Sequence, residues 1–416
     1  MSKYLSRKSI VKKLGPRNFS HLGRRRWSKC WLAGLVIWAA AAQLIAAPRL
    51  ISDGTPSCVT CHISPQGRGL LNNYGRGIDI DQSFSQRDFT GEILGHFVDP
   101  KYADESWKGY FGNVLADVVL TGRFNREFDT NKTDPTFSAL YRQVVFFGAK
   151  KRFRVNTEIG LRDTGLPDTN LGPNLTAVGG DRVFAKKVMI EWRMKKPGTR
   201  AGSELAVGRD YLPIGMQIDD HTAYILHLNR NGIYDFPLQV KYSAWNEKSL
   251  YSTFAYAPSF NEEVDNREYG AGGMYEYYPT DRLVLGVQGL AGLGNESDRV
   301  RVGGYVRWGL SRKWSLLGEI DYTHFWGAGL DDGRGGQTTA FLQLHYKHFE
   351  WLVSSLTGNY AYSELLTSGG SHFSARYTLN ARLSRNVSVG VTYTAGDIRR
   401  NLEDGQEGTV YISMKF

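Results

Sequence analysis

From about Trp107 to the C-terminus, apolar and polar residues alternate in stretches of about ten residues that turn residues separate. A period of two is typical of β-strands with two different faces, and a long series of such stretches indicates a transmembrane β-barrel. The alternation is clearest over residues 314–323, 373–382 and 387–393. We therefore expect an all-β fold, a transmembrane antiparallel β-barrel.

Counting these stretches predicts sixteen strands, an even number as in single-chain bacterial barrels, with fourteen to eighteen as the accepted range. The predicted strands are residues 107–121, 139–149, 151–161, 181–194, 203–210, 236–246, 249–257, 268–278, 282–292, 299–309, 313–324, 337–347, 349–361, 371–383, 386–395 and 407–416. Short gaps such as 246–248 are expected to be periplasmic turns. The gaps expected to be outer loops lie near residues 122–138, 162–180, 211–235 and 325–336.

Three features favour a barrel in lipid over a soluble sandwich, which shares the same period. Charged residues such as Glu319 and Arg376 fall on the face that would be interior, which suits a water-lined lumen better than a dry core. Aromatic residues such as Tyr277 and Trp326 gather near strand ends, as in interfacial girdles. The chain also stops on an amphipathic strand that ends in Phe416, which resembles the assembly signal of bacterial outer-membrane barrels.

The amino-acid composition is typical of a protein with many β-strands. It also excludes a helical membrane protein with several membrane-spanning helices. Glycine accounts for 47 of the 416 residues, and aromatic residues make up 13%. Only the stretch Trp31 to Ala47 approaches the roughly 20 apolar residues that a membrane-spanning helix needs.

The positive charge of the chain is concentrated at its N-terminus. The formal net charge is +10, but residues 1–46 hold ten of the 51 Lys and Arg residues and no Asp or Glu. Without that segment, 41 basic residues face 41 acidic ones, so the remaining chain is neutral. A nucleic-acid partner is therefore not expected, because such a protein needs a basic patch on its folded domain.

Residues 1–46 have the layout of a secretory signal peptide: a basic region, an apolar run from Trp31, and small residues at Ala46 and Ala47. Cleavage after Ala46 is expected, and cleavage after Ala42 is the other option. A retained membrane anchor is the competing interpretation, and the run 24–29 loosely resembles a twin-arginine signal. Export through the periplasm to the outer membrane follows, with outer-membrane lipid as a partner.

The exported chain keeps two cysteines, Cys58 and Cys61, because Cys30 leaves with the signal. With His62 they form C-x-x-C-H, the attachment signature of c-type haem. Two thiols on one turn reach the two vinyl groups of the porphyrin, and the adjacent imidazole becomes the proximal ligand of the iron. A Cys58–Cys61 disulfide, a zinc site and a thioredoxin-type redox pair compete with this interpretation.

Other residues are also candidates for contacts with the haem, although no motif of fixed spacing identifies them. His96 is the first candidate for the sixth iron ligand, followed by Met216 and His221, and an open sixth position is the alternative. Arg68 and Arg76 are candidate partners of the haem propionates, although solvent exposure explains them equally well. Leu70, Leu71 and Tyr74 could pack on the porphyrin face. The H-x-x-H of His345 and His348 would not share one face of a strand, so a metal site there is not favoured.

Together these features predict three parts: the signal peptide over 1–46, a haem-binding segment over 47–106, and the barrel over 107–416. A sixteen-stranded barrel leaves an aqueous channel unless something fills it, so we expect the haem-binding segment to fold into the lumen as a plug.

This combination resembles the fused monohaem cytochrome–porin proteins of bacterial outer membranes, best known from iron oxidisers. The specific matches are Cys58 to His62, Pro65, Leu70, Leu71 and the run Tyr74 to Arg76, whereas the insert 66–69 departs from the iron-oxidiser pattern. The resemblance implies one covalent haem c and electron passage between an extracellular redox partner and periplasmic electron carriers. Such a protein is an electron carrier rather than a conventional enzyme.

Two other functions stay open on the sequence. A passive porin, or a sheath around a separate cytochrome, would have Cys58 and Cys61 as a disulfide or as vestigial residues. An open sixth position would favour a haem enzyme acting on a small oxidant. Because outer-membrane porins often form trimers, a homo-oligomer is a further expectation.

Overall fold

The computed structural model describes residues 51–66, 70–71, 75, 78, 82–84, 114–148, 152–162, 183–194, 201–216, 218, 223–229, 236–258, 267–295, 297–327, 334–364, 370–384, 386–397 and 404–415. The chain divides into two units, residues 1–39 and 40–416, and every described residue belongs to the second. The predicted signal peptide therefore lies outside the described residues.

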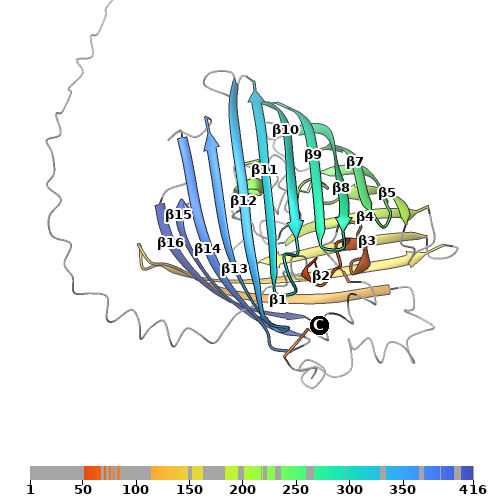
Figure 1. Cartoon of the computed structure of the whole chain (residues 1–416). Coiled ribbons are helices and arrows are strands. Elements are labelled where there is room, and N and C mark those ends of the chain that lie inside the picture. Colours follow the sequence, from red (N-terminus) through yellow and green to blue (C-terminus); the bar gives the residue numbers. More distant parts are fainter. Residues whose placement is uncertain are drawn as a thin grey trace, which may run out of the picture. The chain divides into compact units, whose positions relative to one another are not determined.

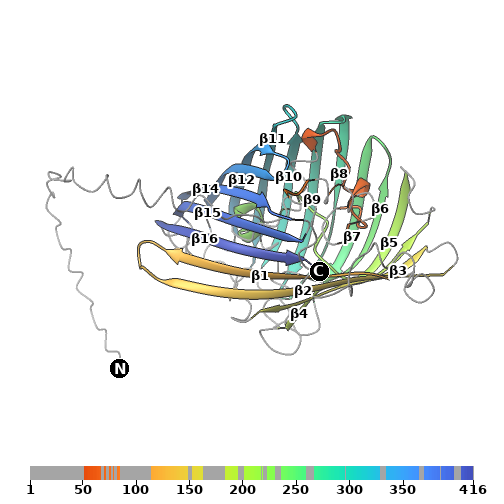
Figure 2. The same cartoon turned by 90° about the horizontal axis from the view of Figure 1, so that it is seen from below.

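Sixteen strands of the described chain form one closed antiparallel barrel (Figure 1). Each strand pairs with its neighbours in sequence, and β1 pairs with β16 to close the ring (Figure 2). The strands are β1 (Val114–Glu127), β2 (Thr133–Phe147), β3 (Phe153–Arg162), β4 (Val183–Arg193), β5 (Gly202–Arg209), β6 (Leu238–Trp245), β7 (Ser249–Ala257), β8 (Glu268–Thr280), β9 (Leu283–Gly294), β10 (Asp298–Trp308), β11 (Trp314–Trp326), β12 (Arg334–Phe349), β13 (Leu352–Ser363), β14 (Gly370–Arg382), β15 (Val387–Asp397) and β16 (Asp404–Lys415). The predicted all-β barrel of sixteen strands is confirmed.

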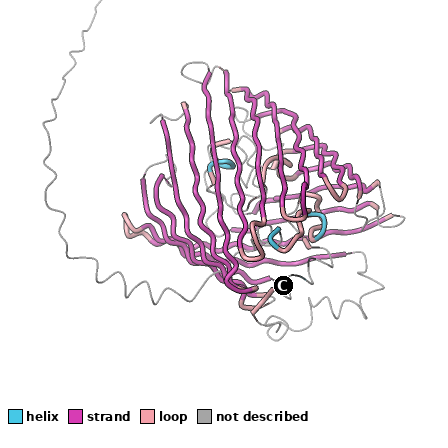
Figure 3. The backbone as a smooth tube through the Cα atoms, viewed as in Figure 1, coloured by secondary structure: helices cyan, strands magenta, loops and turns pink. Residues whose placement is uncertain are grey.

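Short helical segments accompany the strands in the described chain, among them η1 (Cys58–Thr60) and α6 (Tyr224–His227), and Figure 3 draws helix in cyan. No helix in the described ranges has the length and apolar character of a membrane span.

The two faces of the barrel wall differ in polarity, as the alternation predicts. On β11, Ile320 points outward and is 58% exposed, whereas the neighbouring Glu319 and Asp321 point inward and are buried. On β14, Phe373 points outward and is 57% exposed, whereas Ser374 is buried inside. A closed barrel with an apolar outer face and a polar inner face is built to stand in a lipid bilayer.

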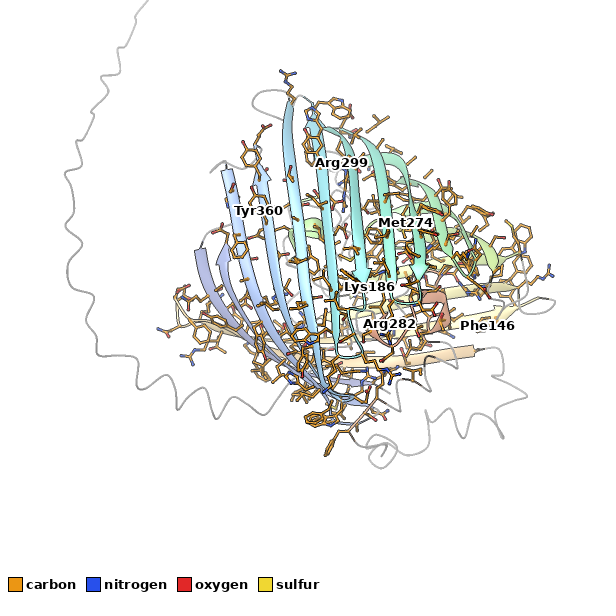
Figure 4. All side chains as sticks on the ribbon, in the orientation of Figure 1. Phe146, Lys186, Met274, Arg282, Arg299 and Tyr360 are labelled. Atoms are coloured by element: carbon orange, nitrogen blue, oxygen red, sulfur yellow. The ribbon has the colours of Figure 1, made fainter. Side chains whose placement is uncertain are left out.

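The two ends of the barrel differ in the length of their connections. Short turns join β2 to β3, β8 to β9, β10 to β11 and β12 to β13, and β1 begins and β16 ends at this same end. In Figure 4, Arg282 of the β8–β9 turn lies at this end of the barrel. Arg299 of β10 lies nearer the opposite end. Short turns are periplasmic in bacterial outer-membrane barrels, so we assign the short-turn end to the periplasm.

The predicted outer loop over residues 122–138 is wrong. Strand β1 continues to Glu127 and β2 begins at Thr133, so only a tight turn separates them. Asn131 takes a positive φ of 54° in this turn, a conformation that asparagine tolerates better than most residues. Polar residues such as Arg123 and Asn125 alternate here with outward apolar residues such as Phe124, as in a strand with two different faces.

The predicted outer loop over residues 211–235 does join two strands at the end opposite the short turns, but its described part folds into the lumen. This β5–β6 connection leaves β5 and reaches α6, which lies against β11, β12 and β13 on the other side of the ring. Its apolar residues explain the direction: Met216 and Ile225 are buried among side chains of the inner wall, including Leu317 of β11. We call residues 210–237 the crossing loop.

Candidate functional site

The C-x-x-C-H motif forms one compact turn. Cys58–Thr60 is a 3-10 turn in which the backbone N–H groups of Cys61 and His62 both donate to the carbonyl of Cys58, at 3.2 and 2.9 Å. His62 then pairs with Leu71 in an isolated antiparallel bridge. Gly75 lies so close that a Cβ there would stand 2.3 Å from the carbonyl oxygen of Cys61, so this position requires glycine. Two thiols and an imidazole thus come from one local turn.

Residues 51–66, which we call the N-terminal segment, contact the inner wall at the short-turn end (Figure 1). Arg307 of β10 donates from Nη1 to the Cys58 sulfur at 3.3 Å. Lys347 of β12 forms an ion pair with Asp53 at 2.9 Å. Gly309, just beyond β10, packs against the backbone of Ile51. The motif therefore lies inside the barrel, at the end that we assign to the periplasm.

Further contacts hold the N-terminal segment to strands on the other side of the lumen. Gln66 donates from Nε2 to the hydroxyls of Ser243 on β6 and Ser252 on β7, at 2.7 and 2.8 Å. Arg193 of β4 donates to the carbonyl of Ile63. Ile63 also packs with Leu70 against the inward face of β2. Because these contacts involve strands on several sides of the ring, the segment bridges part of the lumen.

The two cysteines differ in burial and are both free thiols. Cys61 is buried, and this burial raises the pKa of its thiol to about 11. Burial also raises the pKa of the half-buried Cys58, while the nearby Arg307 guanidinium opposes that rise. Both thiols are therefore protonated at neutral pH and make poor nucleophiles in this packed state.

Arg307 joins Cys58 to a polar cluster on the wall. Its Nη2 lies 2.7 Å from Oε1 of Glu276 on β8. Glu276 also accepts hydrogen bonds from the hydroxyls of Tyr278 and Tyr305, at 2.9 and 2.8 Å. The guanidinium Nε of Arg307 is buried without a hydrogen-bond partner in the described structure. A wall of this kind can favour a polar or negatively charged group beside Cys58.

Of the other residues predicted to bind the iron or the propionates of the haem, only Met216 lies within the described residues. Arg68, Arg76, His96 and His221 lie outside the described residues. Met216 lies in the crossing loop, where its backbone N–H donates to Glu319 Oε2 at 2.7 Å, and its role as an iron ligand stays a prediction.

The second histidine pair has ordinary hydrogen-bond partners. His345 is buried and its Nε2 lies 2.8 Å from Gln343 Oε1, and His348 Nε2 lies 3.0 Å from Ser354 Oγ. Among the described residues, no group of three or more His, Cys, Asp or Glu is arranged to hold a metal ion.

An apolar cluster inside the lumen was not predicted from the sequence. It joins the N-terminal segment, the crossing loop and inward residues of β6 to β12. Its members are Ile51, Met216, Ala223, Ile225, Leu226, Trp245, Leu250, Met274, Tyr278, Val284, Tyr305, Leu317 and Phe341. A signal in the sequence was Leu317, the one apolar residue among the inward positions of β11 from Ser315 to Thr323. The cluster excludes water from this part of the lumen.

Buried ion networks line the wall beside the N-terminal segment. Arg154 of β3 donates to Glu191 of β4 and, at 2.7 Å, to Glu204 of β5. Lys241 of β6 donates both to Asp210, at 3.2 Å, and to Gln66 of the N-terminal segment, at 3.4 Å. The segment is therefore part of the polar network of the wall.

We expect Arg154→Met to destabilise the barrel by about 3 kcal/mol, the lower end for breaking a buried ion pair, since Glu191 and Glu204 lose the Arg154 guanidinium and keep Lys187 and Arg193 as partners. Denaturant unfolding of the barrel in lipid vesicles measures this loss. Lys132→Met is the matched control, because its ion pair with Asp134 is exposed to solvent, and its stability should stay near that of the wild type. Equal stability of the two variants would contradict the importance of the buried network.

Solved structures that share this fold are bacterial outer-membrane porins. The chain is similar to OprB of Pseudomonas putida, with 8% identity, a TM-score of 0.52, and coverage of 76% of this chain and 97% of that one. It is similar to the loop L8 deletion mutant of OmpT of Vibrio cholerae (9% identity, TM-score 0.51, 73% and 99% covered). It is likewise similar to OmpF of Salmonella typhi in complex with daunomycin (10% identity, TM-score 0.51, 73% and 97% covered).

No protein-family model matches the chain, and no curated protein matches it by sequence. At these low identities the structural likeness establishes the fold, a porin-like barrel. Together with the apolar outer face, this fold supports the predicted outer-membrane localisation.

Proposed function

We propose that this chain is an outer-membrane electron-transfer protein that carries one covalent haem c in the lumen of a porin-like barrel. It would pass electrons between periplasmic carriers and an extracellular redox partner. The observation that carries the proposal is the C-x-x-C-H turn, with both thiols free, inside the barrel at the short-turn end.

The residues of the turn fit such a group. Haem iron, when bound, supplies one-electron oxidation and reduction. Cys58 and Cys61 would each add a sulfur to one carbon of a vinyl group and a proton to the other, so the attachment needs no oxidant. His62 would hold the iron from one side. The apolar lumen cluster would keep water from part of the surroundings.

Burial of Cys61 has a consequence for the order of assembly. Its side chain is covered and its thiol is protonated at neutral pH, so attachment in the folded barrel would be slow. We therefore propose that the haem is attached in the periplasm, before the N-terminal segment packs against the wall.

A passive porin, or a sheath for a separate cytochrome, is the second candidate function. The porin-like fold favours it, as does the polar inner wall over β13 to β15, which includes Asn359, Ser374 and Thr394. In that case Cys58 and Cys61 would pair as a disulfide or have no role.

Haem staining of the purified, denatured chain from an outer-membrane fraction distinguishes the two functions. We expect a stained band near the mass of the mature chain and c-type absorption bands after reduction. An unstained band in the same fraction would overturn the electron-transfer proposal and leave the porin as the function.

A further inference from the structure

Gln143 on β2 places an amide on the lipid-facing side of the barrel. Its neighbour Arg142 points into the lumen, where it pairs with Asp117 at 2.7 Å. Its other neighbour, Val144, is fully buried and packs against Ile63 of the N-terminal segment. Because side chains alternate along a strand, Gln143 between them points outward, as do the exposed Tyr141 and Phe147.

The amide lies well inside the apolar band. Phe147 stacks on Phe153 with ring centroids 5.7 Å apart, and Phe153 stacks on Trp192 at 6.1 Å, which marks the aromatic girdle of the short-turn end. Gln143 lies four residues before Phe147 on a tilted strand, so it stands roughly 10 Å inside that girdle. The hydrocarbon of the bilayer offers no hydrogen-bond partner at this depth.

Within the described part of the chain, the Gln143 side chain makes no hydrogen bond. An outward-facing hydroxyl can donate a hydrogen bond to a backbone carbonyl of the neighbouring strand, as Thr253 does to Gly272 at 3.2 Å. A primary amide has two N–H donors as well as an acceptor oxygen, so one backbone carbonyl cannot satisfy all of them. A polar group at this depth is costly unless another protein surface covers it.

The residues around Gln143 suit close contact with a second protein surface. Ala116 of β1 and Thr157 of β3 are its register partners, so it has a small residue on one side and a hydroxyl on the other. Small residues allow two membrane surfaces to approach, and amides and hydroxyls bond across the contact.

We propose that the outer face of β1 to β3 around Gln143 is the contact surface for a second copy of this chain. An amide both donates and accepts, so an identical surface complements it through another Gln143 or through Thr157. The inference stands on the barrel alone and does not depend on the haem.

The test uses a photo-crosslinking amino acid at position 143 of the full-length protein, irradiated in native outer membranes. Two differently tagged copies are expressed together, so that a crosslink between copies is recognised by both tags. The matched control carries the same amino acid at Val287, which is 59% exposed on the outward face of β9, far around the ring. We expect a doubly tagged product of twice the mass at position 143, several-fold above the control.

A second measurement keeps the test independent of the photo-reaction. In Gln143→Leu, loss of the bonding amide should lower the temperature at which the oligomer dissociates, while the monomeric barrel keeps its heat-dependent mobility on gels. A product at 143 no stronger than at 287, a crosslink only to a different protein, or an oligomer unaffected by Gln143→Leu would each overturn the proposal.

Discussion

A Cys58→Ser/Cys61→Ser variant is expected to reach the outer membrane as a folded barrel and to carry no covalent haem. Both thiols lie on the turn that provides the predicted haem linkers, and the described chain holds no other cysteine. The strand pairing of the barrel involves neither residue, so folding should continue. Haem staining of the denatured chain and its shift in mobility on heating measure the two properties separately.

Single variants sharpen this expectation. Cys58→Ser and Cys61→Ser should each retain at most one thioether, which shifts the reduced absorption band because one vinyl group stays unsaturated. Cys30→Ser is the matched control, because Cys30 lies in the predicted signal peptide, and it should stain like the wild type. A double variant that still stains after denaturation would show that the haem is attached elsewhere.

The architecture was accessible from the sequence because a barrel strand is a local pattern. Alternation along single strands predicted the number of strands, and the charged residue Glu319 was assigned to the interior, where the structure has it. The error at residues 122–138 arose because a long hairpin with inward polar residues looks like a loop before its register is known.

The surroundings of the motif were not accessible in the same way. The C-x-x-C-H spacing is local, but Arg307 lies 249 residues from Cys58, and Ser243 lies 177 residues from Gln66. These contacts exist only once the barrel has closed around the N-terminal segment. The inward course of the crossing loop likewise depends on an apolar cluster assembled from many strands, of which Leu317 gave a local sign.

The crossing loop should control how far the lumen conducts. It supplies Met216, Ala223, Ile225 and Leu226 to the apolar cluster. Asn229 fixes it to the wall, since its amide donates to Thr339 Oγ1 at 2.9 Å and accepts from Thr323 and Gln337, each at 3.0 Å. Since β5 and β6 pair directly, a short turn can replace residues 212–236 without opening the barrel.

We expect this replacement to raise ion conductance in planar bilayers several-fold over the wild type, because removing the loop admits water to a cross-section that the cluster keeps dry. The matched control replaces the exposed β1–β2 turn, residues 128–132, which lies at the same end of the barrel and takes no part in the cluster. Its conductance should equal that of the wild type. Asn229→Ala should give an intermediate result, with a fluctuating current, since the loop stays but loses its hydrogen bonds to β11 and β12. A loop replacement that conducts like the wild type would mean that the cluster does not limit flow through this barrel.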